Sequence, residues 1–116
     1  MKISVVIASL GRDQIVNTIN SLNKGSIIPN EIICVFPIKT KIPKGLIRKN
    51  IKFIFSKKKN QIVQRNIGLM KVKNKYVFQI DDDILLSRNC LKNMLHEFKK
   101  LEKQKVAVGP MYFDDN

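Results

Sequence analysis

The stretch KISVVIAS, Lys2 to Ser9, decides the fold. It is continuously apolar and rich in β-branched residues, which is typical of a strand that is covered on both faces. Such strands belong to parallel sheets, because a strand with one solvent-exposed face would alternate apolar and polar residues. Parallel neighbours need long crossover connections, so helices are expected between the strands.

A helix and a second strand follow at the expected spacing. Residues 12–25 place three apolar side chains at helical intervals and end at a glycine. These side chains are Ile15, Ile19 and Leu22. Residues 31–36, EIICVF, predict a second buried strand that Pro37 closes, and the proline- and lysine-rich residues 37–50 predict a loop.

The same alternation continues to the end of the chain. Residues 51–55, IKFIF, predict a third strand, and residues 75–80, KYVFQI, predict a fourth. Between them Asn60 is a suitable N-cap for a helix whose apolar face holds Ile62, Ile67 and Met70. A third helix is predicted within residues 87–104, and its apolar stripe is Leu91, Met94, Leu95, Phe98 and Leu101. VAVGPMYF, residues 106–113, predicts a fifth strand.

Alternating strands and helices predict an α/β fold of βαβ units around a mostly parallel sheet. The length of 116 residues fits one domain, residues 1–116, with one modest core. In such sheets ligands bind outside the carboxyl ends of the strands, near the point where the strand order reverses. The segments that leave the strands are therefore where functional residues are expected.

The chain is strongly basic, with 22 Lys and Arg against 9 Asp and Glu and a net charge of +13. One interpretation is a compositional bias towards lysine, with the charges simply solvated. The other is attraction to an anionic partner: a phosphate-bearing substrate, an acidic membrane surface or nucleic acid. Several of the eight aromatic residues fall in apolar strand patterns that are expected to bury them, so no stacking platform for nucleic acid is expected.

The cysteines, the single histidine and the hydropathy of the chain exclude several classes of protein. Cys34 and Cys90 form no CxxC pair, and His96 is the single histidine, so neither a disulfide scaffold nor a zinc constellation is indicated. A reducing, cytoplasmic compartment is expected. No apolar run approaches the roughly 18 residues that span a bilayer, and the short apolar run at the N-terminus is expected to be a strand rather than a signal peptide.

Three adjacent carboxylates, Asp81 to Asp83, follow the fourth predicted strand. A calcium loop of the EF-hand type is excluded, because Leu86 and Lys92 stand where its glycine and glutamate belong. The aspartates either form an exposed turn, with one of them capping the next helix, or hold a divalent metal that bridges nucleotide phosphates. In an extended segment the first and last of the three would point to the same side.

Other known catalytic and phosphate-binding motifs are missing from the sequence. The five glycines form neither GxxxxGK[ST] nor GxGxxG, which disfavours those two kinds of nucleotide site. One histidine supports no Ser/His/Asp arrangement. The residues alone leave the aspartates open between a turn and a metal site.

Three segments, in order, resemble the N-terminal half of family 2 glycosyltransferases with the GT-A fold. They are ISVVIASLGR at residues 3–12, SLNKGSIIPNEIICV at residues 21–35, and QRNIGLMKVKNKYVFQIDDD at residues 64–83. The resemblance implies a Rossmann-like, three-layer α/β/α sandwich. It also implies transfer of a sugar from a UDP- or GDP-linked donor to an acceptor hydroxyl, in cell-surface polysaccharide synthesis.

The resemblance assigns roles to particular residues. Asp81 and Asp83 match the DxD pair, in which the first aspartate contacts the donor ribose and the last coordinates Mn²⁺ or Mg²⁺ on the diphosphate. Asp81 is also a candidate metal ligand, and Asp82 between them is a candidate donor-binding residue. The remaining candidates for donor binding are Ala8, Ser9, Arg12, Arg65 and Asn66.

The chain departs from the family pattern in two places. Pro37 and Lys39 follow the second strand, where the family often has an acidic residue that contacts the base. The family's second half, with the acceptor site and catalytic base, has no counterpart, and Asp114 and Asp115 come too early to be that base. No catalytic residue is assigned, and we expect a truncated chain that binds donor and metal but transfers sugar poorly alone. A basic surface also suits peripheral contact with an anionic inner membrane face.

A second hypothesis comes from a different class. It is a non-catalytic module that binds anionic ligands, nucleotide or nucleic acid, with the aspartates as a simple turn. This module would bind without metal and with steep salt dependence.

Overall fold

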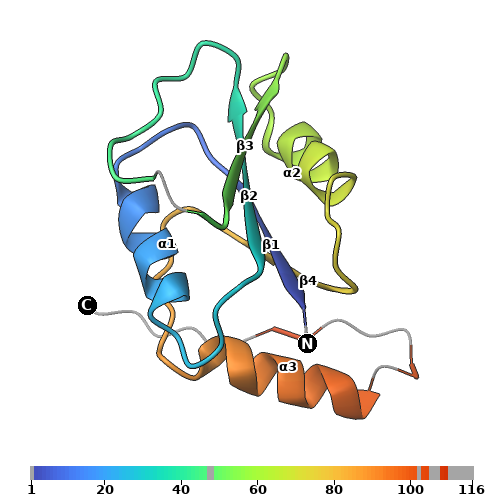
Figure 1. Ribbon diagram of the computed structural model, residues 1–116. Coiled ribbons are helices and arrows are strands. Elements are labelled where there is room, and N and C mark those ends of the chain that lie inside the picture. The colour runs from blue at the N-terminus through green and yellow to red at the C-terminus, as the bar shows by residue number, and fades with distance from the viewer. Residues whose placement is uncertain (1, 47–48, 102, 105–107, 110–116) are drawn as a thin grey trace.

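The computed structural model of the chain describes residues 2–46, 49–101, 103–104 and 108–109 (Figure 1). Within them the elements run, in chain order, β1 (Ile3–Ala8), α1 (Gln14–Asn23), β2 (Glu31–Pro37), β3 (Ile51–Ser56), α2 (Gln61–Leu69), β4 (Tyr76–Ile80) and α3 (Cys90–Leu101). The predicted α/β class is confirmed. The fifth predicted strand falls largely outside the described residues.

The strands form a parallel sheet in the order β3-β2-β1-β4. β1 is central, so that Val5 pairs with Ile32 of β2 on one side and with Phe78 of β4 on the other. After β3 the chain returns across the sheet through α2 to form β4. The strand order therefore reverses between β1 and β4, and helices α1 and α2 lie on opposite sides of the sheet (Figure 1).

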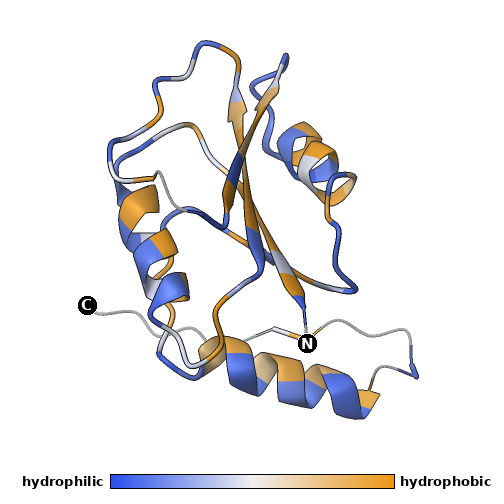
Figure 2. Cartoon of the chain, viewed as in Figure 1, coloured by the Kyte–Doolittle hydropathy of each residue, from blue (hydrophilic) through white to orange (hydrophobic). Residues whose placement is uncertain are grey.

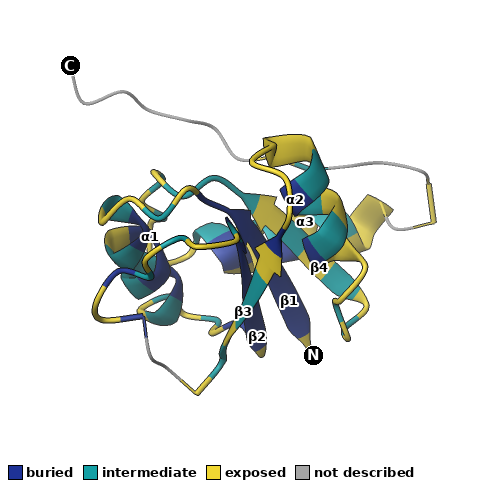
Figure 3. Ribbon diagram, turned by 90° about the horizontal axis from the view of Figure 1, so that it is seen from above, coloured by how far each residue is buried: buried dark blue, intermediate teal, exposed yellow. Residues whose placement is uncertain are grey.

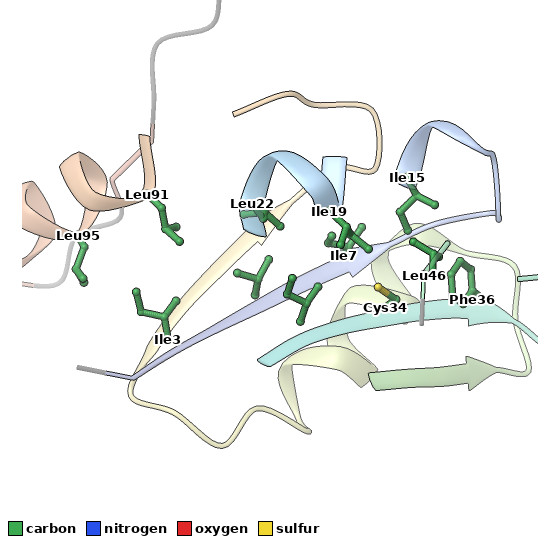
Figure 4. Close-up of a cluster of buried hydrophobic side chains, with 12 residues drawn as sticks. Ile3, Ile7, Ile15, Ile19, Leu22, Cys34, Phe36, Leu46, Leu91 and Leu95 are labelled. Carbon is green, nitrogen blue, oxygen red and sulfur yellow. The ribbon is translucent and has the colours of Figure 1, made fainter. Parts of the chain in front are cut away.

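The core is built on β1, in which all six residues are buried. Ile3, Val5 and Ile7 point to the side of the sheet that α1 covers, where they meet its buried residues Ile15, Ile19 and Leu22. Figure 4 shows Leu91 and Leu95 of α3 beside Ile3, so α3 closes the same core at the amino end of the sheet. Seen from above in Figure 3, β1 and β2 are the most buried strands.

A loop, rather than a helix, connects β2 to β3, as predicted. Its described part buries Leu46 completely in the cluster that α1 covers. Gly45, just before it, has φ +93°, a left-handed backbone conformation that glycine adopts without strain. The loop thus supplies one anchored side chain where other crossovers supply a helix.

Helix α2 begins as predicted, but it buries a different face. The side chain of Asn60 accepts hydrogen bonds from the backbone N–H groups of Ile62 at 2.9 Å and Val63 at 3.1 Å, which confirms the N-cap. The prediction of an apolar face made of Ile62, Ile67 and Met70 was wrong for Ile62 and Met70, which are 68% and 84% exposed, whereas Ile67 is half-buried. The buried residues of α2 are Gln64 and Gly68.

Gly68 explains why this face of α2 is the buried one. A Cβ at Gly68 would lie 2.5 Å from Val6 Cγ1 and 3.1 Å from Val35 Cγ2. The absence of a side chain therefore lets the backbone of α2 approach β1 and β2 closely. Close packing of this kind leaves no room for isoleucine or methionine side chains between helix and sheet.

Helix α3 buries only part of the apolar stripe that was predicted for it. Leu91 and Leu95 are buried, Met94 and Phe98 are half-buried, and Leu101 is 38% exposed. Figure 2 shows the alternation of hydrophobic and hydrophilic residues along this helix. The ring of Phe98 meets Tyr76 of β4 edge to face, with 6.1 Å between the ring centres. Among the described residues, no helix combines the length and apolar character that crossing a bilayer requires.

The two cysteines are free thiols. Cys34 lies inside β2, where burial raises the pKa of its thiol to about 12. Burial also raises the pKa of Cys90, the first residue of α3. Both thiols therefore stay protonated and unreactive at neutral pH.

A buried carboxylate holds the amino end of the sheet together. Glu31 Oε2 accepts hydrogen bonds from Ser4 Oγ at 2.6 Å and from the backbone N–H of Lys73 at 2.7 Å. Its Oε1 accepts from Lys52 Nζ at 3.0 Å. Burial raises the pKa of Glu31, but the hydrogen bonds from Ser4, Lys73 and Lys52 lower it more, so the pKa lies below the ordinary value.

Glu31→Gln is expected to destabilise the protein by about 1–3 kcal/mol at pH 7, because it removes the charge from buried hydrogen bonds. A lowered pKa stabilises the fold at pH values above the ordinary 4.5, and that stabilisation is lost as the pH falls through the folded-state pKa. Urea unfolding from pH 7 to pH 3 should therefore show the gap between wild type and variant shrinking below about pH 4.5. A gap that stays constant over this range would contradict the assignment.

Candidate functional site

A cavity of about 290 Å³ lies at the carboxyl end of β1, where the strand order reverses. Three segments wall it: the exit of β1, the start of α2 and the turn after β4. Its polar lining is Ser9, Arg12, Lys59, Gln61, Gln64 and Asp82. This is the place where ligands bind in open parallel sheets.

One hydrogen bond joins the two strand exits across this cavity. Ser9 Oγ donates to Asp82 Oδ2 at 2.6 Å, and the backbone N–H of Gly11 donates to Ser9 Oγ at 3.0 Å. Thr18 Oγ1, from α1, donates to the backbone carbonyl of Asp82 at 2.8 Å. Asp82 is thereby fixed through both its side chain and its backbone, a positioning role that the sequence did not indicate.

The loop after β1 depends on Gly11. Its φ is +88°, and a Cβ there would lie 2.5 Å from Thr40 Cγ2. Only glycine fits this conformation and this contact without strain. The turn directs the chain so that Arg12, whose side chain is exposed, lines the cavity with Ser9.

Gln64 forms the buried floor of the site and was missed in the sequence analysis. Its side-chain Nε2 donates to the backbone carbonyls of Ser9 at 2.9 Å and Val35 at 2.8 Å. The residue is 1% exposed. A polar side chain just before Arg65 and Asn66, on a helix predicted to bury isoleucine and methionine, was the available signal.

The three aspartates do not share one extended segment. β4 ends at Ile80, and Asp82 and Asp83 lie in a turn, so the extended segment on which the expected strand alternation depended is not observed. None of them caps a helix, because α3 begins only at Cys90. The turn of the first interpretation is thus observed and its cap is not, while the second interpretation, a metal site, stays a prediction.

Each aspartate has a distinct environment. Asp81 Oδ1 forms an ion pair with Arg65 Nη2 of α2, and the Asp81 side chain is 48% exposed. Asp82 is held by Ser9. Asp83 is exposed and makes no hydrogen bond or ion pair with any described residue. The outer two carboxylates therefore keep oxygen atoms available to a ligand.

Arg65 and Asn66, both candidates for donor binding, have different surroundings in the structure. Arg65 Nε is sealed from solvent and lacks a hydrogen-bond partner, the single side-chain nitrogen or oxygen in this state among the described residues. Asn66 is exposed and does not line the cavity, whereas Ala8, at the end of β1, does.

The described residues fit a divalent metal of one particular kind. They contain no cluster of three or more His, Cys, Asp or Glu side chains able to hold a metal by themselves. Carboxylate oxygens suit Mg²⁺ or Mn²⁺, and Mg²⁺ in nucleotide sites takes one or two carboxylates and completes its shell with phosphate oxygens and water. Asp81 and Asp83 meet that requirement.

Positive charge gathers in the lining of the cavity and in the loop beside it. Arg12 and Lys59 line it, and the exposed Lys57 and Lys58 precede Lys59 in the loop after β3. The cavity is small, and its lining holds two cations, Arg12 and Lys59, and one carboxylate, Asp82, that is already hydrogen-bonded to Ser9. This balance of charge favours an anionic ligand.

The sequence matches the family model described as "Glycosyl transferase family 2" over residues 4–116. The chain belongs to this family. No curated protein matches the chain in sequence. The expected resemblance is thus confirmed over nearly the whole chain.

Solved structures confirm the GT-A fold. S. aureus TarS 1–349 superposes with a TM-score of 0.73 at 21% identity, and the match covers 88% of this chain and 33% of that one. The same protein "in complex with UDP" gives a TM-score of 0.67 at 20% identity, over 88% of this chain and 33% of that one. The chain thus spans about a third of the length of these structures.

The bridge between Ser9 and Asp82 is testable by a double-mutant cycle. Ser9→Ala and Asp82→Ala should each lower the free energy of unfolding, and the double variant should lose less than their sum by about 1–2 kcal/mol. Chemical unfolding of the four proteins measures this coupling. The matched cycle of Ser9→Ala with Asp83→Ala should give a coupling near zero, and equal coupling in both cycles would refute the bridge.

Proposed function

We propose that the chain is the donor-binding part of a glycosyltransferase that moves a sugar from a UDP- or GDP-linked donor to an acceptor hydroxyl. The observation that carries this proposal is the cavity at the strand-order reversal, which Ser9 and Asp82 bridge and which the Asp81–Asp83 turn flanks. Family membership and the UDP complex of TarS support a nucleotide-sugar donor.

In this proposal each wall of the cavity has its own task. Arg12 and Lys59 offset the charge of the diphosphate, and the Ser9 loop and Gln64 shape the space that receives the nucleoside. Arg65 holds Asp81 in place through their ion pair. Asn66 lies farther from this cavity, so it has no assigned contact.

Asp83 and Asp81 would hold Mn²⁺ or Mg²⁺ in this proposal. When bound, such a metal supplies Lewis-acid stabilisation of the departing nucleoside diphosphate. The contribution of the chain is orientation: the Ser9–Asp82 and Thr18–Asp82 hydrogen bonds fix the turn from which Asp83 projects. An acceptor site and a catalytic base are not assigned to any residue.

Asp83→Asn tests this proposal directly. Calorimetric titration of wild type with UDP and with GDP should show binding that depends on Mn²⁺, and the substitution should weaken it at least tenfold, to the level measured without metal. Asp13→Asn, at another exposed aspartate near the site, is the matched control and should bind as wild type does. Binding that ignores metal and Asp83 but falls steeply with salt would instead support a simple anion-binding module.

The basic surface supports a location at the cytoplasmic face of an anionic membrane, in cell-surface polysaccharide synthesis. The exposed lysines of the loops that leave β2 and β3 lie at the carboxyl edge of the sheet. They are Lys39, Lys41, Lys57, Lys58 and Lys59. In this arrangement the donor cavity opens near the membrane surface.

Flotation with phosphatidylserine-containing vesicles at physiological salt should carry the protein upward, whereas pure phosphatidylcholine vesicles should not. The double variant Lys57→Gln/Lys58→Gln should weaken partitioning by about fivefold per lysine, or about 1 kcal/mol each. Lys92→Gln/Lys103→Gln, with the same charge change elsewhere, should lose much less. Absence of flotation of wild type would remove the membrane from the proposal.

A further inference from the structure

The side-chain amide of Gln64 has a fixed orientation. Nε2 donates to two backbone carbonyls, those of Ser9 and Val35, at 2.9 and 2.8 Å. An amide group has two N–H donors, so both are used. A flipped amide would set its oxygen against two carbonyl oxygens and lose both hydrogen bonds. The structure therefore decides which atom of this amide is left over, and that atom is Oε1.

The remaining polar atom of the amide, Gln64 Oε1, accepts no hydrogen bond from a described residue, and Gln64 is 1% exposed. It is also not sealed off, because the one sealed and unpaired side-chain polar atom among the described residues is Arg65 Nε. Gln64 lines the cavity, so the access that Oε1 keeps is through it.

We propose that Gln64 Oε1 is the atom that recognises the nucleobase, by accepting a hydrogen bond from a ring N–H. This inference rests on the proposed binding of a nucleoside diphosphate. A carbonyl-type oxygen is an acceptor only, so the ligand atom that meets it must be a donor. A ligand that places a lone pair there leaves a buried acceptor unsatisfied, which is costly.

Uracil meets this requirement through its ring N3–H, and guanine meets it through its ring N1–H. Cytosine and adenine present an unprotonated ring nitrogen at the corresponding position, and its lone pair would face that of Oε1. The exit of β2 provides no substitute acceptor side chain, since Pro37, Ile38 and Lys39 follow its buried part.

The ligand side of this contact can be changed without altering the protein. Calorimetric titration of wild type with Mn²⁺ present would compare UDP, 3-methyl-UDP and CDP. UDP should bind at least about tenfold more tightly than the other two, because 3-methyl-UDP lacks the N–H and CDP presents a lone pair. Metal-dependent binding of UDP and 3-methyl-UDP with equal affinity would overturn the role of Gln64 and leave the proposed function standing.

Substitution of Gln64 tests the contribution of the protein to this hydrogen bond. Gln64→Met keeps the length of the side chain and removes the acceptor, so the ratio of UDP to 3-methyl-UDP affinity should fall to near one. Gln79→Met makes the same change at an exposed residue of β4 outside the cavity and should keep the wild-type ratio. An unchanged ratio in folded Gln64→Met would overturn the inference.

Two further outcomes separate this inference from the proposed function. If CDP binds with metal as tightly as UDP, the donor site stands and the role of Gln64 fails. If no nucleoside diphosphate binds wild type with or without metal, the proposed function fails and the inference fails with it. Thermal unfolding shows whether the Gln64→Met variant is folded. The comparison of UDP with 3-methyl-UDP on wild type tests the role of Gln64 even if the variant does not fold.

Discussion

The site depends on how closely helix α2 approaches the sheet. Gly68 brings the helix backbone against Val6 and Val35, and one turn earlier the same approach brings Gln64 within reach of two strand ends. Arg65 follows on the next position and pairs with Asp81 at the end of β4. A bulkier residue at position 68 would push the helix outward, and both contacts would lengthen together.

The two ends of the sheet are stabilised by different chemistry. At the amino end, Glu31 gathers charged and polar donors in a buried network. At the carboxyl end, Thr18 and Gln64 donate to backbone carbonyls and Ser9 donates to the Asp82 side chain, while Arg12 and Lys59 line the cavity. The ion pair of Arg65 with Asp81 adds one charged contact at this end, whereas Arg12 and Lys59 remain directed at the cavity.

The sequence predicted most of the fold because the strands carry a strong local signal. Each of the first four strands is an apolar run, and α1 buries the side chains whose spacing predicted it. Helix α2 was placed correctly by its cap, but its buried face was not, since periodicity ranks Ile62 and Met70 above Gln64 and Gly68. Only the tertiary contact at Gly68 makes a polar face the inner one.

The candidate site was predicted at the level of segments rather than atoms. The exits of β1 and β4 were expected to carry it, and Ala8, Ser9, Arg12 and Asp82 do line or bridge one cavity. Lys59 lies in a run of three lysines, and such a run gives no sign of which lysine lines a cavity. Gln64 and Thr18 were missed for a related reason: their partners are backbone carbonyls, which every residue has.

The amide of Gln64 also has a spectroscopic consequence. Side-chain amide protons of glutamine normally exchange with water quickly and overlap in a crowded part of the nitrogen–proton spectrum. The two protons on Nε2 are buried and each points at a carbonyl oxygen, so they should exchange slowly and resonate apart from the rest. The chain thus contains an intrinsic reporter in the floor of its cavity, on which occupancy can be followed without attaching a label.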